Sequence, residues 1–229
     1  MSNEKIYTIR ISEAMDEKCG CPLCAVKKKL EAEELERILG AAMMEPDVRI
    51  ETNAKGFCSP HLAAMQGMSN KLSLALMLGT HLEALHKKVY KDTAPLFKKI
   101  PDPKKQQAAL AANAKQCYLC SRINEFMSAT ELTFAFMYKT VPEFEAKIKE
   151  QPYFCLDHQK KLLEAAPREL DKEAYKSFAA AINGVSSAYA EKLVGDLDWF
   201  CKKFDYRYKD EDWKDSKDAI DRAIKFLNE

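Results

Sequence analysis

Two sets of cysteine and histidine residues with nearly identical spacing constrain this sequence more than any other feature. In each set a Cys-x2-Cys motif precedes a Cys-x2-His motif, with 33 residues between the motifs in the first set and 34 in the second. The positions are Cys21, Cys24, Cys58 and His61 in the first set and Cys117, Cys120, Cys155 and His158 in the second. Equivalent positions lie 96 or 97 residues apart. Four positions at matched offsets predict one structural unit that is used twice.

Structural zinc explains these residue types and spacings best. Such an ion takes four Cys or His ligands in a tetrahedron, and a Cys-x2-Cys turn presents two thiolates together. We therefore expect two zinc ions per chain, each held by the four residues of one set as a Cys3His site. Six thiolates and two zinc ions would change the formal net charge only from +1 to −1.

Three other uses of the motifs fit the sequence less well. Cys21 and Cys24 have the form of a thiol–disulfide motif, but no βαβ pattern surrounds them and the Cys-x2-His motifs would then have no role. An iron–sulfur cluster usually takes four cysteines. A catalytic zinc usually keeps an open position beside three protein ligands, whereas each set here supplies four.

The other cysteines and histidines have no matched partner in the repeat. Cys19 is either a spare thiol or a ligand that replaces Cys21. Cys201 lies in an apolar stretch and is expected in the core, where free cysteine is common. His81 and His86 are expected to pack on a helix or to lie on the surface.

The composition predicts an all-α fold. The chain has only seven glycines, and long stretches are rich in the helix formers Ala, Leu, Glu and Lys. Apolar residues recur at helical spacing after Cys24, from Met65 to Val89, and from Tyr175 to Phe200. The Cys-x2-His motifs are expected to begin helices, with Ser59 and Asp157 as N-caps.

Two apolar stripes are predicted to face the core. Between Met65 and Val89 the stripe steps alternately by three and four residues, as in a helix–helix seam. Its members are Met65, Met68, Leu72, Ala75, Gly79, Leu82, His86 and Val89. A last helix from about Asp215 is expected to turn Ile220, Ile224 and Leu227 inward. The segment 6–11 is the only strand-like piece and is too short to stand as a sheet.

The repeat, and the prolines between its two copies, predict that the chain is divided into four parts. Residues 1–90 form the first repeat with its metal set, and residues 106–204 form the second. Residues 91–105, which contain Pro95, Pro101 and Pro103, connect them. Residues 205–229 form a C-terminal tail and helix.

The charge and hydropathy patterns exclude several functions. Lys and Arg number 36 against 35 acidic residues, and the lysine doublets, such as Lys202–Lys203, read as solvated helix faces, so nucleic-acid binding is disfavoured. No apolar run approaches the roughly 18 residues of a membrane span. The N-terminal segment lacks an apolar signal core. We therefore expect a cytoplasmic protein without a membrane segment.

Several segments together carry a resemblance to a known family. They are GAAMMEPDVRIETNAKGFCSPHL, LALMLGTHLE and KFDYRYKDEDWKDSKDAIDRAIKFL. The sequence resembles an uncharacterised bacterial domain-of-unknown-function family that is common in clostridia and their relatives. The resemblance covers nearly the whole chain and implies a cytoplasmic bacterial protein. It brings no activity and no catalytic residue.

These observations favour a non-enzymatic, zinc-binding helical scaffold that binds an unidentified protein or other ligand. The alternative from another class is a thiol-redox or metal-responsive protein that uses the Cys-x2-Cys pairs. A nucleic-acid-binding protein is the third interpretation. No residue is predicted to be catalytic.

Overall fold

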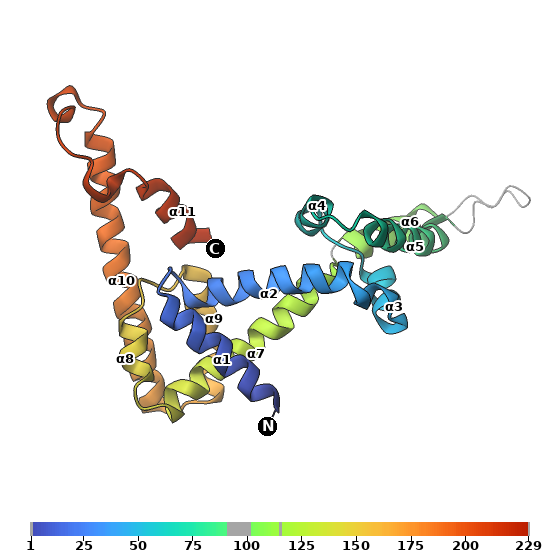
Figure 1. The fold of residues 1–229 in the computed structure, drawn as a ribbon, viewed down its shortest axis with the longest axis horizontal. Helices are drawn as coiled ribbons and strands as arrows, with labels where there is room; N and C mark the ends of the chain where they lie inside the picture. Colours follow the sequence, from blue (N-terminus) through green and yellow to red (C-terminus); the bar gives the residue numbers. More distant parts are fainter. Residues whose placement is uncertain (1, 91–101, 115, 229) are drawn as a thin grey trace, which may run out of the picture. The chain divides into compact units, whose positions relative to one another are not determined.

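The protein is all-helical, as predicted. The computed structural model describes residues 2–90, 102–114 and 116–228, and these residues contain no β-strand. The α-helices (Figure 1) are α1 (Ser2–Glu17), α2 (Pro22–Leu39), α3 (Pro46–Lys55), α4 (Ser59–Gly67), α5 (Lys71–Tyr90), α6 (Pro103–Ala114), α7 (Tyr118–Thr140), α8 (Phe144–Lys149), α9 (Leu156–Ala165), α10 (Lys172–Lys202) and α11 (Ala219–Asn228). Short 3-10 turns include η1 (Ala41–Met44), η3 (Ala166–Arg168), η4 (Tyr206–Tyr208) and η5 (Lys214–Ser216).

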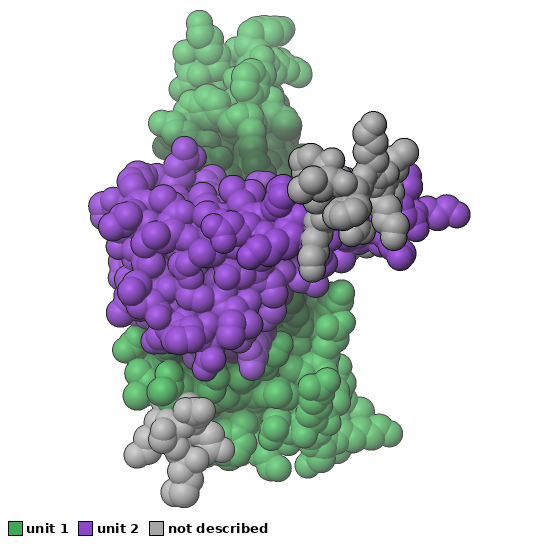
Figure 2. All heavy atoms as spheres, turned by 90° about the vertical axis from the view of Figure 1, so that its right-hand side faces the viewer, with its two compact units in different colours: residues 1–28, 127–229 green, residues 29–126 purple. Residues whose placement is uncertain are grey.

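The helices form two compact units (Figure 2). Unit 1 comprises residues 1–28 and 127–229, and unit 2 comprises residues 29–126. Unit 2 is thus an insertion between two segments of unit 1, and these boundaries differ from those of the sequence repeat. Because the boundaries fall inside α2 and α7, each of these helices contributes residues to both units.

Unit 1 is built around phenylalanine side chains. The Phe134 ring meets those of Phe144, Phe154 and Phe178 at centroid distances of 4.9, 5.9 and 6.2 Å. All four are almost completely buried. Edge-on contacts of this kind add to the apolar area that each ring removes from water.

Unit 2 buries mainly aliphatic side chains, and α3 packs along α5. Met65 on α4 and Met77 on α5 are fully buried, as is Ile38 on α2. Arg49 of α3 ties the two packed helices together, because its guanidinium donates to Thr80 Oγ1 at 2.9 Å.

The predicted seam from Met65 to Val89 is wrong in its middle. The helix breaks after Gly67, and Asn70 begins α5 anew by accepting a hydrogen bond from the Ser73 amide at 3.2 Å. This break changes the face that points inward. Leu72 and Leu82 are 71% and 59% exposed, whereas Leu74 and Met77 are buried.

The predicted inward face of the last helix is also wrong. Ile220, Ile224 and Leu227 are each about half exposed. Phe226 is buried instead, because its ring contacts Tyr153 and Tyr189 at centroid distances of 5.7 and 5.6 Å.

Three smaller expectations are corrected or fall outside the described residues. The strand-like segment 6–11 lies inside α1 and buries Ile11 on a helical face. Of the predicted connector, residues 91–101 lie outside the described residues, and Lys104 and Lys105 belong to α6. Lys203 is buried rather than solvated, because its ammonium donates to the carbonyls of Tyr208 and Lys209.

Candidate metal centres

Each of the four predicted motifs stands at the start of a helix. The first residue of every motif directly precedes its helix, and the last is the third helical residue. The pairs are Cys21 and Cys24 on α2, Cys58 and His61 on α4, Cys117 and Cys120 on α7, and Cys155 and His158 on α9. Both side chains of a pair therefore lie on one face of the first turn. The partial positive charge of a helix N-terminus favours thiolates there.

The cysteines themselves take the N-cap positions of α4 and α9. The sequence predicted Ser59 and Asp157 as caps, but α4 begins at Ser59 and α9 at Leu156. Cys58 and Cys155 hold the extended backbone that precedes each helix, and neither makes a side-chain cap.

The pair on α2 meets the pair on α9 in unit 1. The ligand atoms of Cys21, Cys24, Cys155 and His158 lie within 4.8 Å of one another, a group that we call centre A. His158 Nδ1 lies 3.1 Å from Cys24 Sγ, 3.2 Å from Cys155 Sγ and 3.7 Å from Cys21 Sγ.

The pair on α4 meets the pair on α7 in unit 2. Cys58, His61, Cys117 and Cys120 form centre B by the same criterion. His61 Nδ1 lies 3.1, 3.3 and 3.5 Å from the Sγ atoms of Cys58, Cys117 and Cys120. All eight predicted residues therefore enter two Cys3His groups.

The predicted grouping of the eight residues is wrong, however. Each Cys-x2-Cys joins the Cys-x2-His of the other set, not that of its own. The reason is the long helix that each Cys-x2-Cys begins. The 18 residues of α2 put about 27 Å between its ends at 1.5 Å per residue. The Cys-x2-His that follows α2 lies further along this helix in unit 2, with His61 beside Glu31, and there it meets the start of α7.

The distances fit a tetrahedral zinc ion. Zn–S bonds of about 2.3 Å and Zn–N bonds of about 2.0–2.1 Å place tetrahedral ligand atoms roughly 3.5–3.8 Å apart. The Cys24 and Cys155 sulfurs are 3.4 Å apart, and the Cys58 and Cys120 sulfurs are 3.7 Å apart. The donor set of each centre therefore suits a thiophilic ion with only a slight adjustment of the side chains.

The pKa values of the thiols differ within each centre. Burial raises the pKa of Cys21 to about 12, and hydrogen bonding to Cys155 raises that of Cys24. The pKa of Cys155 is lowered by the same thiols. In centre B, burial opposes ionisation of Cys117, but hydrogen bonds headed by that from His61 lower its pKa to about 6. One thiol in each centre is thus the easiest to ionise, and ionisation of all three would need a nearby cation such as zinc.

The two histidines differ in what holds their outer nitrogen. His61 Nε2 lies 3.1 Å from a carboxylate oxygen of Glu31 on α2. His158 Nε2 is buried and has no hydrogen-bond partner among the described residues. At the position 97 residues after Glu31 stands Ser128, which carries no carboxylate. A partner on the outer nitrogen fixes a ligating histidine, so Glu31 belongs to centre B.

A glycine next to each centre was not predicted from the sequence. Gly56, two residues before Cys58, has φ +62°, and a Cβ there would lie 2.6 Å from His81 Nε2. Gly20, just before Cys21, has φ +133° and lies against the Tyr153 hydroxyl. The sequence feature that could have identified both is a glycine within two residues of a predicted ligand, in a chain that has only seven glycines.

The remaining cysteines and histidines, which are Cys19, Cys201, His81 and His86, lie outside both centres. Cys19 is exposed and neighbours a carboxylate oxygen of Glu17 at 3.8 Å. Cys201 is exposed, so its predicted core position is wrong. His81 packs inside unit 2, where its Nδ1 lies 2.9 Å from the carbonyl oxygen of Asn53. These residues complete neither centre.

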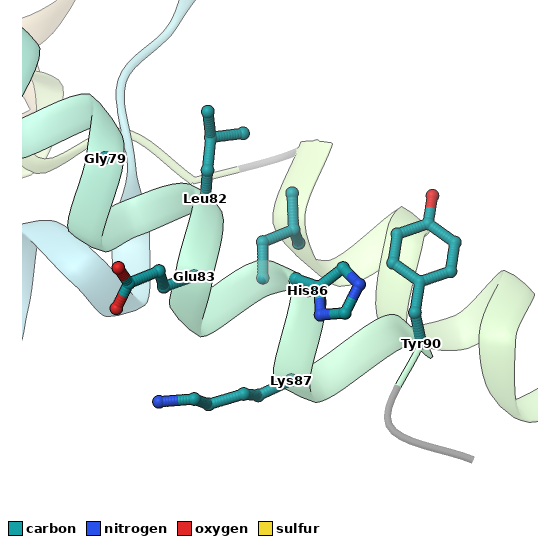
Figure 3. A pocket seen from close by; sticks show the side chains of 7 residues that line it. Gly79, Leu82, Glu83, His86, Lys87 and Tyr90 are labelled. Atoms are coloured by element: carbon teal, nitrogen blue, oxygen red, sulfur yellow. The ribbon is translucent and has the colours of Figure 1, made fainter. Parts of the chain in front are cut away.

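A separate hollow runs along the C-terminal half of α5. Its volume is about 610 Å³, and its described lining comes from α5 alone. Figure 3 shows Leu82, His86 and Tyr90 on one side of this helix and Glu83 and Lys87 on another. No residue of either metal centre lines it.

No described helix is both long and apolar enough to cross a lipid bilayer. Neither the curated proteins nor the solved structures contain a match to the chain. The model of a family of unknown function, DUF6062, matches residues 1–229. Because this match covers the whole sequence, the chain belongs to the DUF6062 family.

Proposed function

We propose that this protein is a non-enzymatic helical scaffold held by two zinc ions. The observation that carries the proposal is the donor count of each centre. Three thiols and one imidazole nitrogen converge in each, which completes a tetrahedron and leaves no position for a substrate. Each zinc would fix the starts of two helices that are far apart in sequence. This use of metal is structural, because binding to such a site stabilises the folded chain.

The scaffold would present a protein-binding surface on unit 2. Ile50 on α3, together with Leu72, Leu76 and Leu82 on α5, exposes large apolar side chains, and the two helices pack against each other. Apolar surface of this kind commonly marks an interaction site. We place the protein in the cytoplasm, where thiols stay reduced and available to zinc.

Metal analysis of protein purified without added metal tests the proposal. We expect two zinc ions per chain, a colourless solution and protection of the six ligand thiols from alkylation until a chelator is added. The paired control is protein in which Cys19 and Cys201 are changed to Ser and Ala, which should retain both ions. A brown, iron-containing protein, or a metal-free protein that is equally stable, would contradict it.

A thiol-redox function is the second candidate, and one observation favours it. Cys58 and Cys120 of centre B are partly exposed, and their sulfurs are 3.7 Å apart. If these thiols react with alkylating reagent at once and form a disulfide in mild oxidant without prior metal loss, this candidate replaces the first. No described feature specifically favours nucleic-acid binding.

A further inference from the structure

A polar hollow lies where the chain turns back from α10 into α11, within unit 1. It has a volume of about 360 Å³ and is distinct from both metal centres. Tyr189 and Lys192 of α10 form one side, and residues 214–218 with Arg222 of α11 form the other. Figure 1 shows this return of the chain beside the end of α10.

The walls of this hollow are held by a dense set of contacts. The Trp199 indole nitrogen donates to the Asp212 carbonyl at 3.0 Å. The Lys203 ammonium binds carbonyl oxygens of the same turn, and its nitrogen lies 5.4 Å from the centre of the Trp213 ring. Ser216 is buried and donates to the Trp213 carbonyl at 2.6 Å. The hollow is therefore preformed, as small-molecule sites usually are.

The charges around the hollow do not balance. Its lining has four cationic side chains and two carboxylates, and a third carboxylate, that of Asp196, binds Arg222 from outside the lining. Lys192 pairs with Asp215 at 2.9 Å. Arg222 pairs with Asp218, also at 2.9 Å, and with Asp196 behind the hollow.

Two ammonium groups are left over by these pairs. Lys217 has no hydrogen-bond or ion-pair partner among the described residues. The Lys214 nitrogen lies 4.0 Å from the centre of the Trp199 ring, and no carboxylate pairs with it in the part of the chain that the structure describes. Lys214 also has φ +52°, which is unfavourable for a residue with a side chain.

We infer that this hollow binds a small molecule that carries a phosphate group. Two ammonium groups without a carboxylate partner match the two negative charges of a phosphate monoester, and Tyr189, which lines the hollow, has a hydroxyl group that can donate a hydrogen bond. A volume of about 360 Å³ falls at the lower end of the range for small-molecule sites. Lys214 and Lys217 would bind the phosphate group. Arg222, through its ion pairs, would hold the edge of the hollow in place.

The test is titration of the zinc-loaded full chain with inorganic phosphate and with pyrophosphate, at constant ionic strength against sodium chloride. Tryptophan emission reports binding, because Trp199 lies beneath Lys214. Melting temperature gives a second readout. The metal content is counted after each titration, so that loss of zinc is not mistaken for binding. We expect saturable changes in both readouts with phosphate or pyrophosphate, but none with chloride.

The variants Lys217→Ala and Lys214→Asn locate the site. Each should weaken binding about tenfold or more, since each removes a charge-assisted contact. Asparagine tolerates positive φ, so Lys214→Asn should fold at least as well as the parent. Lys176→Ala, which removes an exposed lysine elsewhere on α10, should bind like the parent. Unchanged emission and melting in phosphate and pyrophosphate, or unchanged binding by both site variants, would overturn the inference.

Discussion

The two candidate metal centres have the same residue types in the same helical positions, yet their surroundings differ. In centre A, Cys21, Cys155 and His158 are buried, and the outer nitrogen of the histidine has no partner among the described residues. In centre B, Cys58 and Cys120 are partly exposed and the histidine is held by a carboxylate. Centre A is thus the more buried of the two, with only Cys24 partly exposed, whereas in centre B only His61 and Cys117 are buried.

The length of the closed loop should not decide which centre contributes more to stability. Centre A joins Cys24 to Cys155 across 131 positions, and centre B joins Cys58 to Cys120 across 62. Doubling a loop costs only about 0.6 kcal/mol of closure free energy. Leaving a buried polar or charged group without its partner costs several times more. Burial should therefore decide which centre matters more for stability.

The charge networks of the two centres also differ at equivalent positions. Glu34 of unit 2 is buried, and Arg122 and Arg37 hold its pKa below the usual value despite that burial. Glu131, 97 residues later, is buried in unit 1, where burial raises its pKa. The carboxyl group of Glu34 is thus easier to ionise and that of Glu131 easier to protonate, because two guanidinium groups bind Glu34, whereas burial dominates at Glu131.

The largest expected effect comes from removing one buried ligand. Cys155→Ala should abolish metal binding at centre A and lower the free energy of unfolding of unit 1 by about 3–5 kcal/mol, since three ligands stay buried and incomplete. Cys58→Ala should lower the free energy of unfolding of unit 2 by clearly less, because centre B is partly open to water. Zinc content and hydrogen exchange resolved by unit measure both effects, with one zinc remaining in each variant. Equal losses of stability in the two variants would mean that burial does not determine how much each centre contributes.

The glycine beside centre B should be the next most sensitive position. Gly56→Ala should destabilise unit 2 by about 1–3 kcal/mol, because φ +62° is strained for alanine and the new Cβ would meet His81. Zinc affinity at centre B should fall with it. Gly79→Ala in α5 is the matched control, since a Cβ there has open space and a helical alanine should stabilise by about 1 kcal/mol. Thermal unfolding and zinc competition measure the stability and zinc affinity of both variants. A Gly56→Ala variant that matches the parent in both would contradict the prediction.

A smaller effect is expected from the carboxylate that supports centre B. Glu31→Gln should weaken zinc at centre B about tenfold and leave centre A unchanged, because Glu31 acts only through His61. Competition with a chromogenic chelator separates the two affinities. Glu36→Gln, an exposed change on the same helix, serves as the control. If both variants lose affinity equally, the effect comes from net charge and not from the contact with His61.

The smallest effects are expected from the cysteines outside the centres. Cys19→Ser and Cys201→Ala should keep two zinc ions and change the free energy of unfolding by less than about 0.5 kcal/mol, since both side chains are exposed. Metal analysis and chemical unfolding measure this. Loss of one ion from Cys19→Ser would show that Cys19 is a ligand of centre A.

Several properties could be predicted from the sequence because they depend on neighbouring residues. The cysteine spacing indicated eight ligands, and the low glycine content indicated helices. Helical spacing from Tyr175 to Phe200 identified α10, which buries Phe178, Ile182 and Leu193. These are local patterns, and a three-residue interval on a first helical turn places two ligands together wherever that helix lies.

Which pairs lie together as one candidate metal centre was decided only in the tertiary structure. The two Cys-x2-His motifs are chemically equivalent, so the spacing fits either grouping, and the length of α2 carries Cys58 away from Cys21. The inward face of α11 was decided in the same way, because Phe226 reaches Tyr153 and Tyr189. The support of Glu31 for His61 also depends on residues 30 positions apart. Such choices depend on where whole helices meet, which residue types and their spacing along the chain do not specify.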